Sequence, residues 1–383
     1  MPLARFGLTY FCYLLYLGSW SPYWTTWATQ GLHFSDDVIS LLAPLFVASA
    51  FVGNFFISRL ADRLRWRRRL QRALTLVAIG TCIAWSFVSS PYTAAALIAL
   101  HGTTGHVQTG LLDASIIDAL GPRRNRYGIL RAMGSVGFAI SSLVVGRLRD
   151  GHPEVIPIAF VVGMTAFHVM TWFVPDTQPM HVEVEPERPR IGAAQILRIR
   201  PLVLLFVVAI LHAAAFAPYE FFGPRYFAAA GLTPAQNGQL YPVGIVSEVL
   251  VFVGGTALVR RFRPAHLAAF AVLLAAVRWF VMARVDGVFA MTALQVTHGV
   301  CFGLFYSSAV HIVSGLVPQE ARTTGQALFS MSLGLGYGTG GFLAGQAIRR
   351  IGPERTLDCA SMVGIIAFVV LVIVERRSHR RGE

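Results

Sequence analysis

Five ionisable side chains lie inside long apolar runs of the sequence: Asp113, Arg131, Glu248, Arg278 and His298. In a hydrocarbon environment such a side chain is costly unless it is paired or wetted, so each one is a candidate for solute binding or proton transfer. A carboxylate beside a guanidinium can hold a polar solute. A carboxylate, a guanidinium and an imidazole together can take up and release a proton. The alternative for each group is a structural ion pair or a hydrogen-bonded histidine between helices.

The distances of these residues from the turns predict which of them lie level with one another. On antiparallel neighbouring helices, Asp113 and Arg131 are equidistant from residue 122 and can pair in the cytoplasmic half. Glu248 and Arg278 are equidistant from residue 263, and Arg278 and His298 from residue 288. These three would share a level about 15 residues, or ~22 Å of helical rise, from a turn centre. We therefore expect Glu248, Arg278 and His298 to form a proton relay near the membrane midplane.

Aromatic side chains gather at the end of the first apolar run. Trp20, Trp24 and Trp27 recur at helical spacing, with Tyr23 beside them. They could stack on a planar or ring-shaped solute. Trp and Tyr at the outer end of a helix also serve as interfacial anchors, and this alternative is strongest for Trp27.

The composition indicates that these residues lie in a membrane. Of the 383 residues, 55% are hydrophobic and only 13% are charged, so there is no polar shell for a water-soluble core. At roughly 20 residues per span, a dozen helices and short loops use nearly the whole chain. We expect an all-α membrane protein with transmembrane helices near 6–29, 38–58, 72–90, 92–119, 127–148, 155–174, 201–228, 237–258, 266–284, 287–316, 324–347 and 356–375.

The arginines predict the orientation of the chain. All 32 basic residues are arginine, and with a cytoplasmic N-terminus 23 of them fall in cytoplasmic loops and ends. This asymmetry follows the positive-inside rule and places both termini in the cytoplasm. We expect a multi-pass protein of the plasma membrane, as in a bacterial inner membrane. The net charge of +13 is then explained without nucleic acid as a partner.

A polar, proline-rich stretch at 175–200 divides the chain into two similar halves. We expect a six-helix bundle at 1–174, a cytoplasmic linker at 175–200, and a second six-helix bundle with a short cytoplasmic tail at 201–383. Gly31-Leu32 matches Gly231-Leu232 at an offset of 200, and His101-Gly102 matches His298-Gly299 at an offset of 197. Matches at a nearly constant offset predict two pseudo-symmetric bundles with the solute held between them.

The basic turn at 58–70 resembles the signature loop of the major facilitator superfamily. Asp62, Arg63, Arg67 and Arg68 match the signature, whereas Ser58 and Arg65 replace its two glycines. The resemblance implies a gating loop that exchanges charge contacts with helix ends as the two halves rock. The alternative is an ordinary basic cytoplasmic turn.

The stretch YGILRAMGS at 127–135 is similar to a motif of the lactose permease and phenylpropionate permease families. The resemblance implies that Arg131 binds substrate together with Asp113, and it extends to the aromatic first helix with Trp20, Tyr23 and Trp24. It also covers the positions of Glu248, Arg278 and His298. Phe138 occupies the place of a ring-stacking Trp in the sugar symporters.

One position departs from the sugar symporters of this kind. They carry a Glu three residues after the histidine, and here that residue is Cys301. We expect proton symport of a small organic solute, such as an aromatic carboxylate, by alternating access. A proton-independent facilitator and a sugar or nucleoside symporter are the alternatives, and a transporter-like membrane sensor is a weaker one. We expect no catalytic residues, no metal and no cofactor. Small-molecule substrate, protons and membrane lipid are the expected partners of a monomer.

Overall fold

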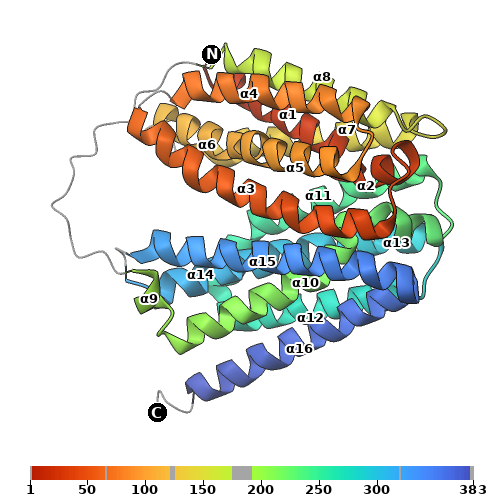
Figure 1. The fold of residues 1–383 in the computed structure, drawn as a ribbon. Coiled ribbons are helices and arrows are strands. Elements are labelled where there is room, and N and C mark those ends of the chain that lie inside the picture. The colour runs from red at the N-terminus through yellow and green to blue at the C-terminus, as the bar shows by residue number, and fades with distance from the viewer. Residues whose placement is uncertain (1, 65–66, 121–125, 175–191, 319–320, 380–383) are drawn as a thin grey trace. The chain divides into compact units, whose positions relative to one another are not determined.

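The computed structural model describes residues 2–64, 67–120, 126–174, 192–318 and 321–379, and the elements in these ranges are helical (Figure 1). The first part of the chain contains α1 (Pro2–Trp20), α2 (Trp24–Thr26), η1 (Trp27–Gly31), α3 (Asp36–Leu64), α4 (Arg67–Ala84), η2 (Trp85–Phe87), α5 (Pro91–Gly105), α6 (Val107–Leu120), α7 (Tyr127–Leu148) and α8 (Val155–Thr171). The second part contains α9 (Ala193–Ile196), α10 (Arg200–Ala229), α11 (Pro234–Arg261), α12 (Pro264–Met282), α13 (Gly287–Val296), η4 (Val300–Leu304), α14 (Phe305–Leu316), α15 (Arg322–Ile351) and α16 (Pro353–His379).

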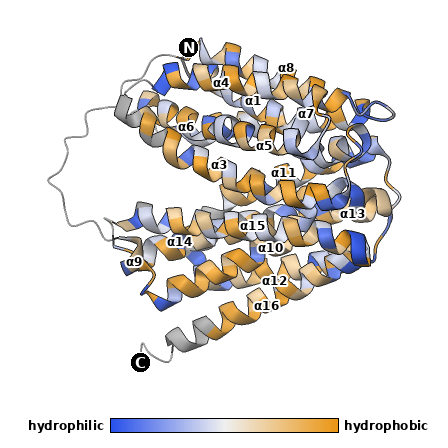
Figure 2. Ribbon diagram, in the orientation of Figure 1, coloured by the Kyte–Doolittle hydropathy of each residue, from blue (hydrophilic) through white to orange (hydrophobic). Residues whose placement is uncertain are grey.

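The long helices follow the apolar runs of the sequence. Joined across short breaks, the described helices give twelve rods at the twelve expected ranges, and α7 has the expected bounds. Within the described residues, seven are long and apolar enough to cross a membrane. Figure 2 shows hydrophobic residues along the helices and hydrophilic ones gathered towards their ends. This confirms the expected all-helical membrane fold.

Packing divides the chain into two units. Unit 1 contains residues 1–183 and 233–242, and unit 2 contains residues 184–232 and 243–383. The division near residue 183 falls in the expected linker 175–200, of which residues 175–191 lie outside the described ranges. The first residues of α11 cluster with unit 1, whereas we expected everything after residue 200 to form one bundle.

Proline and capping residues set the ends and bends of several helices. Ser90 and Thr93 form a reciprocal capping box at the start of α5, with Pro91 at the first helical position. In α10, Pro218 and Pro224 flank Phe222, whose φ of −123° and ψ of 15° are not helical. Proline removes a backbone donor and crowds the preceding turn, so α10 kinks there.

The helices of each unit pack side by side. In unit 1, α1 packs on α7 and α8, α3 packs on α5, and α4 packs on α8. In unit 2, α10 packs on α15 and α16, and α12 packs on α14 and α16. These contacts place the polar residues of the spans on packed helices, where neighbouring side chains can satisfy them.

The same helix crossing occurs in both units. Ser49 on α3 lies against Gly102 on α5, so a Cβ at Gly102 would collide with the Ser49 hydroxyl. In unit 2 the Gly299 backbone N–H donates to the Ser247 Oγ at 2.7 Å, and a Cβ at Gly299 would collide with the backbone at Ser247. These pairs are related by offsets of 198 and 197 residues, so the repeat in the sequence is also a repeat of packing.

We expect Gly299→Ala to destabilise the protein by about 1–3 kcal/mol, because the methyl group overpacks a backbone-to-backbone crossing. Gly315→Ala is the matched control, since a Cβ at Gly315 meets nothing within 4 Å. Thermal unfolding of the two purified variants in detergent measures the difference. Equal unfolding temperatures for the two variants would contradict the tight crossing.

Candidate functional site

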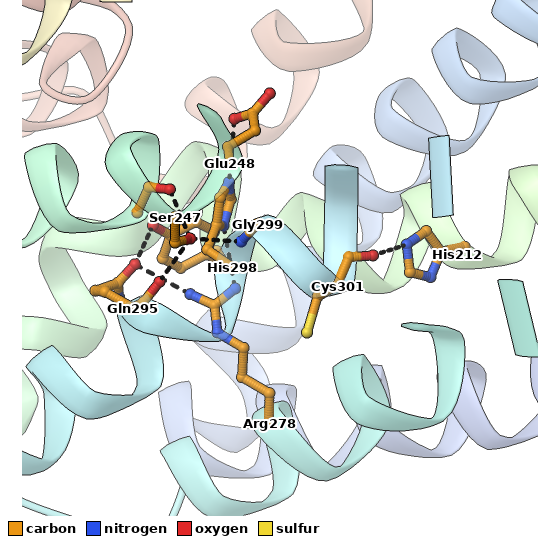
Figure 3. A network of polar contacts seen from close by, with 10 residues as sticks. His212, Ser247, Glu248, Arg278, Gln295, His298, Gly299 and Cys301 are labelled. Atoms are coloured by element: carbon orange, nitrogen blue, oxygen red, sulfur yellow. Dashed lines mark hydrogen bonds and ion pairs between the residues drawn. The ribbon is translucent and has the colours of Figure 1, made fainter. Parts of the chain in front are cut away.

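Glu248, Arg278 and His298 lie together in unit 2 (Figure 3). An Arg278 guanidinium nitrogen lies 3.1 Å from His298 Nδ1, and His298 Nε2 lies 4.0 Å from Glu248 Oε2. Arg278 is 1% exposed, whereas the Glu248 side chain is 26% exposed. The three residues come from α11, α12 and the segment after α13, as the distances from the turns predicted. Their role in proton transfer stays a prediction.

The contact with Arg278 determines the protonation of His298. A guanidinium can only donate, so His298 Nδ1 accepts and carries no proton. The proton of the neutral imidazole then lies on Nε2, the atom that faces Glu248. The 4.0 Å separation is too long for a hydrogen bond, so the imidazole and the carboxylate stand next to each other without being bonded.

Neutral groups complete the surroundings of Arg278. Gln295 Oε1 accepts from Arg278 at 3.1 Å and from the Tyr219 hydroxyl at 2.8 Å. The guanidinium also lies 4.7 Å from the ring centroids of Tyr219 and Trp279. Among the described residues no carboxylate forms an ion pair with Arg278. Dipoles and aromatic faces therefore make the direct contacts with the Arg278 charge, and the Glu220 carboxylate acts on it from a longer distance.

Gln295 and Tyr219 were not among the residues predicted from the sequence. Gln295 lies three residues before His298 and therefore on the same helix face, which is a signal that spacing could have given. Tyr219 precedes Glu220, a carboxylate within electrostatic range of Arg278. A search for charged side chains in apolar runs does not find uncharged residues such as Gln295 and Tyr219.

The matching histidine of unit 1 has neutral partners. His101 contacts the hydroxyls of Tyr16 and Thr81, with 2.7 Å between Thr81 Oγ1 and His101 Nδ1. The offset of 197 relates Thr81 to Arg278 and His101 to His298, and each pair meets at Nδ1 of the imidazole. Unit 2 thus carries a charge where unit 1 carries a hydroxyl.

In unit 1, Tyr10 joins Asp113 and Arg131. The Tyr10 hydroxyl donates to Asp113 on α6, and the Arg131 guanidinium on α7 lies 5.5 Å from the centroid of the Tyr10 ring. We expected Asp113 and Arg131 to lie level and to be able to pair, and the described residues contain no ion pair between them. Equal distance from a turn predicts depth, and it does not predict that a tyrosine of α1 stands between two helices.

Of the aromatic residues predicted to bind solute, Trp20, Tyr23 and Trp24 are buried inside unit 1 and Phe138 is half-buried. Trp20 stacks on Phe160 at 4.2 Å between ring centroids, and the Tyr23 hydroxyl donates to the Ser142 carbonyl at 2.6 Å. Trp24 is also buried, and the Phe138 backbone lies against Gly18. These contacts support the helix packing of unit 1. Binding of solute by these rings stays a prediction.

The described arginines of the predicted gating loop contact other helices of unit 1. Arg67 forms an ion pair with Asp118 on α6 at 2.6 Å, and Arg68 donates to the carbonyl of Trp172 at 2.8 Å. Asp62 and Arg63 lie in the last turns of α3, but their side chains lie outside the described residues. The two described arginines therefore contact the ends of other helices.

Cys301 lies at the first turn of the π-helical segment η4. Its carbonyl accepts from His212 Nε2 at 3.1 Å, and its buried thiol lies 4.0 Å from the Thr297 hydroxyl. A thiol gives no carboxylate at this position, so Glu248 is the acidic group of the cluster beside His298. Within the described ranges, no group of three or more His, Cys, Asp or Glu residues could hold a metal ion.

Comparison with known proteins supplies the family. The sequence model of the MFS_1 like family matches residues 3–358. The "Probable 3-phenylpropionic acid transporter" of Escherichia coli is 25% identical over 318 residues, which cover 80% of this chain and 81% of that protein. The "Maltose permease" of Geobacillus stearothermophilus is 26% identical over 277 residues, covering 71% and 69% of the two chains.

Solved structures share the fold at low sequence identity. The nucleoside transporter NupG matches 97% of this chain and 98% of its own with a TM-score of 0.85 and 14% identity. A bacterial homologue of the human lysosomal transporter Spinster matches 98% and 96% with a TM-score of 0.78, also at 14% identity. At this identity the likeness establishes the fold alone.

Proposed function

The chain belongs to the MFS_1 like family of membrane transporters for small solutes, and from this premise we propose that it carries a small aromatic carboxylate together with protons. The observation that carries the proposal is the contact chain from Arg278 through His298 to Glu248 in unit 2. It combines a buried fixed charge, a neutral imidazole and a partly exposed carboxylate. We place the protein in the plasma membrane as a monomer with both termini in the cytoplasm.

Glu248 is the proton-binding group in this proposal. Protonation of His298 at Nδ1 would set an N–H against the donating Arg278, so the imidazole resists a second proton while that contact lasts. The Arg278 contacts to His298 and Gln295 place no N–H against the Glu248 carboxylate, so it can accept a proton. Movement of Arg278 relative to Glu248 during alternating access would change the affinity of the carboxylate for a proton.

Arg131 is the proposed anchor for the solute carboxylate. Its planar guanidinium can donate two parallel hydrogen bonds to a carboxylate, and Asp113 orients the site through Tyr10. The similarity to a phenylpropionic acid transporter supports an aromatic solute. Trp20, Tyr23, Trp24 and Phe138 supply the ring contacts in this proposal.

A proton-independent facilitator is the second candidate, and Cys301 favours it. With a thiol in place of the sugar-symporter glutamate, the cluster has one carboxyl group fewer for proton uptake. The similarity to a maltose permease keeps a sugar open as the solute, and a nucleoside stays open as the alternative expected from the sequence.

The test is the movement of protons when solute is added to proteoliposomes without any imposed gradient. We expect 3-phenylpropionate to make the medium alkaline, because each solute that enters takes a proton with it. Maltose and uridine, added separately, test the other two classes of solute.

Protein-free liposomes are the necessary control, since a weak acid crosses lipid in its protonated form and moves protons unaided. The signal that counts is the increase in initial rate caused by the protein. If 3-phenylpropionate enters without extra proton movement, the protein is a proton-independent facilitator. If only maltose or only uridine enters, the transported solute is a sugar or a nucleoside and not an aromatic carboxylate.

A further inference from the structure

Two arginines, Arg68 and Arg72, contact an exposed tryptophan where the start of α4 lies beside the end of α8 in unit 1. Arg72 stacks on the indole of Trp172, with 3.8 Å between the guanidinium carbon and the ring centroid. Arg68 donates to the Trp172 carbonyl at 2.8 Å, and Arg72 contacts the Thr171 carbonyl at 3.4 Å. Arg69 lies between them in sequence and is exposed. We call these three arginines and Trp172 the α4–α8 corner.

The indole of the corner is held in one place and is still exposed. The Trp172 Nε1–H donates to His168 Nε2 at 3.2 Å, and His168 Nδ1 lies 2.6 Å from the Thr75 hydroxyl. Trp172 nevertheless has 56% of its surface exposed. Fixing an exposed aromatic ring through a chain of hydrogen bonds reduces the entropy that a ligand must remove on binding.

The corner lies at the end of an exposed apolar surface, which we expect to face lipid. Along α4, Arg69, Arg72 and Leu76 follow one another at helical spacing, and Leu76 is 57% exposed. On α8, Val169 is 48% exposed next to Trp172. Charges therefore begin where the apolar surface stops, as expected at the level of lipid headgroups on the side that we place in the cytoplasm.

We propose that the α4–α8 corner binds the phosphodiester headgroup of an anionic phospholipid. The arginine N–H groups suit phosphate oxygens, whereas the exposed apolar side chains below suit acyl chains. A nucleic acid or an acidic peptide offers the charge but no acyl chains that would run along the apolar surface at Leu76 and Val169. Lipid binding at the α4–α8 corner does not depend on which solute is transported.

The test uses quenching of Trp172 fluorescence by brominated lipids in nanodiscs. The protein has seven tryptophans, so the Trp172 signal is the difference between the wild type and Trp172→Phe. We expect brominated phosphatidylglycerol to quench this signal more strongly than brominated phosphatidylcholine at equal mole fraction. Each arginine near an anionic lipid strengthens binding roughly fivefold, so Arg69→Gln should reduce the preference about fivefold, and Arg69→Gln with Arg72→Gln further.

Arg198→Gln is the matched control, because it removes an exposed arginine from unit 2. It should leave the preference intact. Equal quenching by the two brominated lipids would overturn the proposal. A preference that survives both arginine substitutions, or that falls equally in Arg198→Gln, would overturn it too, because general attraction by the net charge would then explain it. Loss of Arg72 could disturb the end of α8, which it contacts. In that case the single variant Arg69→Gln tests the proposal, because Arg69 is exposed.

Discussion

Purified Arg131→Ala protein should lose solute binding by at least roughly a hundredfold, the scale expected when a hydrogen-bonded charge pair loses one partner. Arg131→Lys should restore only part of the affinity, because an ammonium is a point charge and cannot form the two parallel bonds of a guanidinium. Isothermal titration or tryptophan fluorescence with 3-phenylpropionate measures both variants.

Arg126→Ala controls for the loss of one positive charge on the same stretch of chain. Arg126 precedes α7 and its side chain makes no cap hydrogen bond, so its removal should not change binding. If Arg131→Ala binds the solute with near-normal affinity, Arg131 is not the anchor.

Asp113→Asn should weaken binding to a similar extent. An amide offers Tyr10 a weaker acceptor and offers Arg131 no counter-charge, so the guanidinium loses the arrangement that the Tyr10 bridge gives it. Tighter binding of the anionic solute in Asp113→Asn would mean that the carboxylate opposes the solute rather than completing its site.

The helices could be predicted from the sequence because burial in lipid demands long apolar runs. The run at 127–148 predicted α7 to the residue. The run at 287–316 was also correct in extent, but it contains α13, η4 and α14. Hydropathy does not distinguish a π-helical turn from an α-helical one, so the break around Cys301 could not be predicted.

The cluster in unit 2 was more predictable than the one in unit 1 for a geometric reason. Glu248, Arg278 and His298 contact one another in a row, so equal distances from two turns were enough to bring them together. Asp113 and Arg131 meet through Tyr10, which lies on α1, about a hundred residues before Asp113. Which helix packs across a hairpin is a property of the tertiary structure that turn distances do not contain.

Glu248→Gln should allow exchange of solute across the membrane while eliminating its accumulation. Glutamine has the shape and neutrality of a protonated glutamate, so the transporter would behave as though its proton were always bound. A carrier in that state can still move solute in both directions, but the proton gradient no longer drives it.

The measurement is counterflow and gradient-driven uptake in proteoliposomes, each compared with protein-free vesicles. If one proton accompanies each solute, a gradient of one pH unit supports a concentration ratio of about tenfold in the wild type, since each factor of ten corresponds to about 1.4 kcal/mol. Glu248→Gln should show counterflow near the wild-type rate and no protein-dependent accumulation. Glu354→Gln, the same change at an exposed position in the first turn of α16, should behave like the wild type.

The two assays separate a proton site from a structural carboxylate. If Glu248 only held the packing of α11, its replacement would impair counterflow and accumulation together. If Glu248→Gln still concentrates solute under an imposed proton gradient, the proton travels through another group. Glu220 is then the first candidate, because it lies within electrostatic range of Arg278, and Asp113 in unit 1 is the second. Because Arg278 occupies Nδ1, His298 becomes a candidate only in a conformation in which that contact is broken.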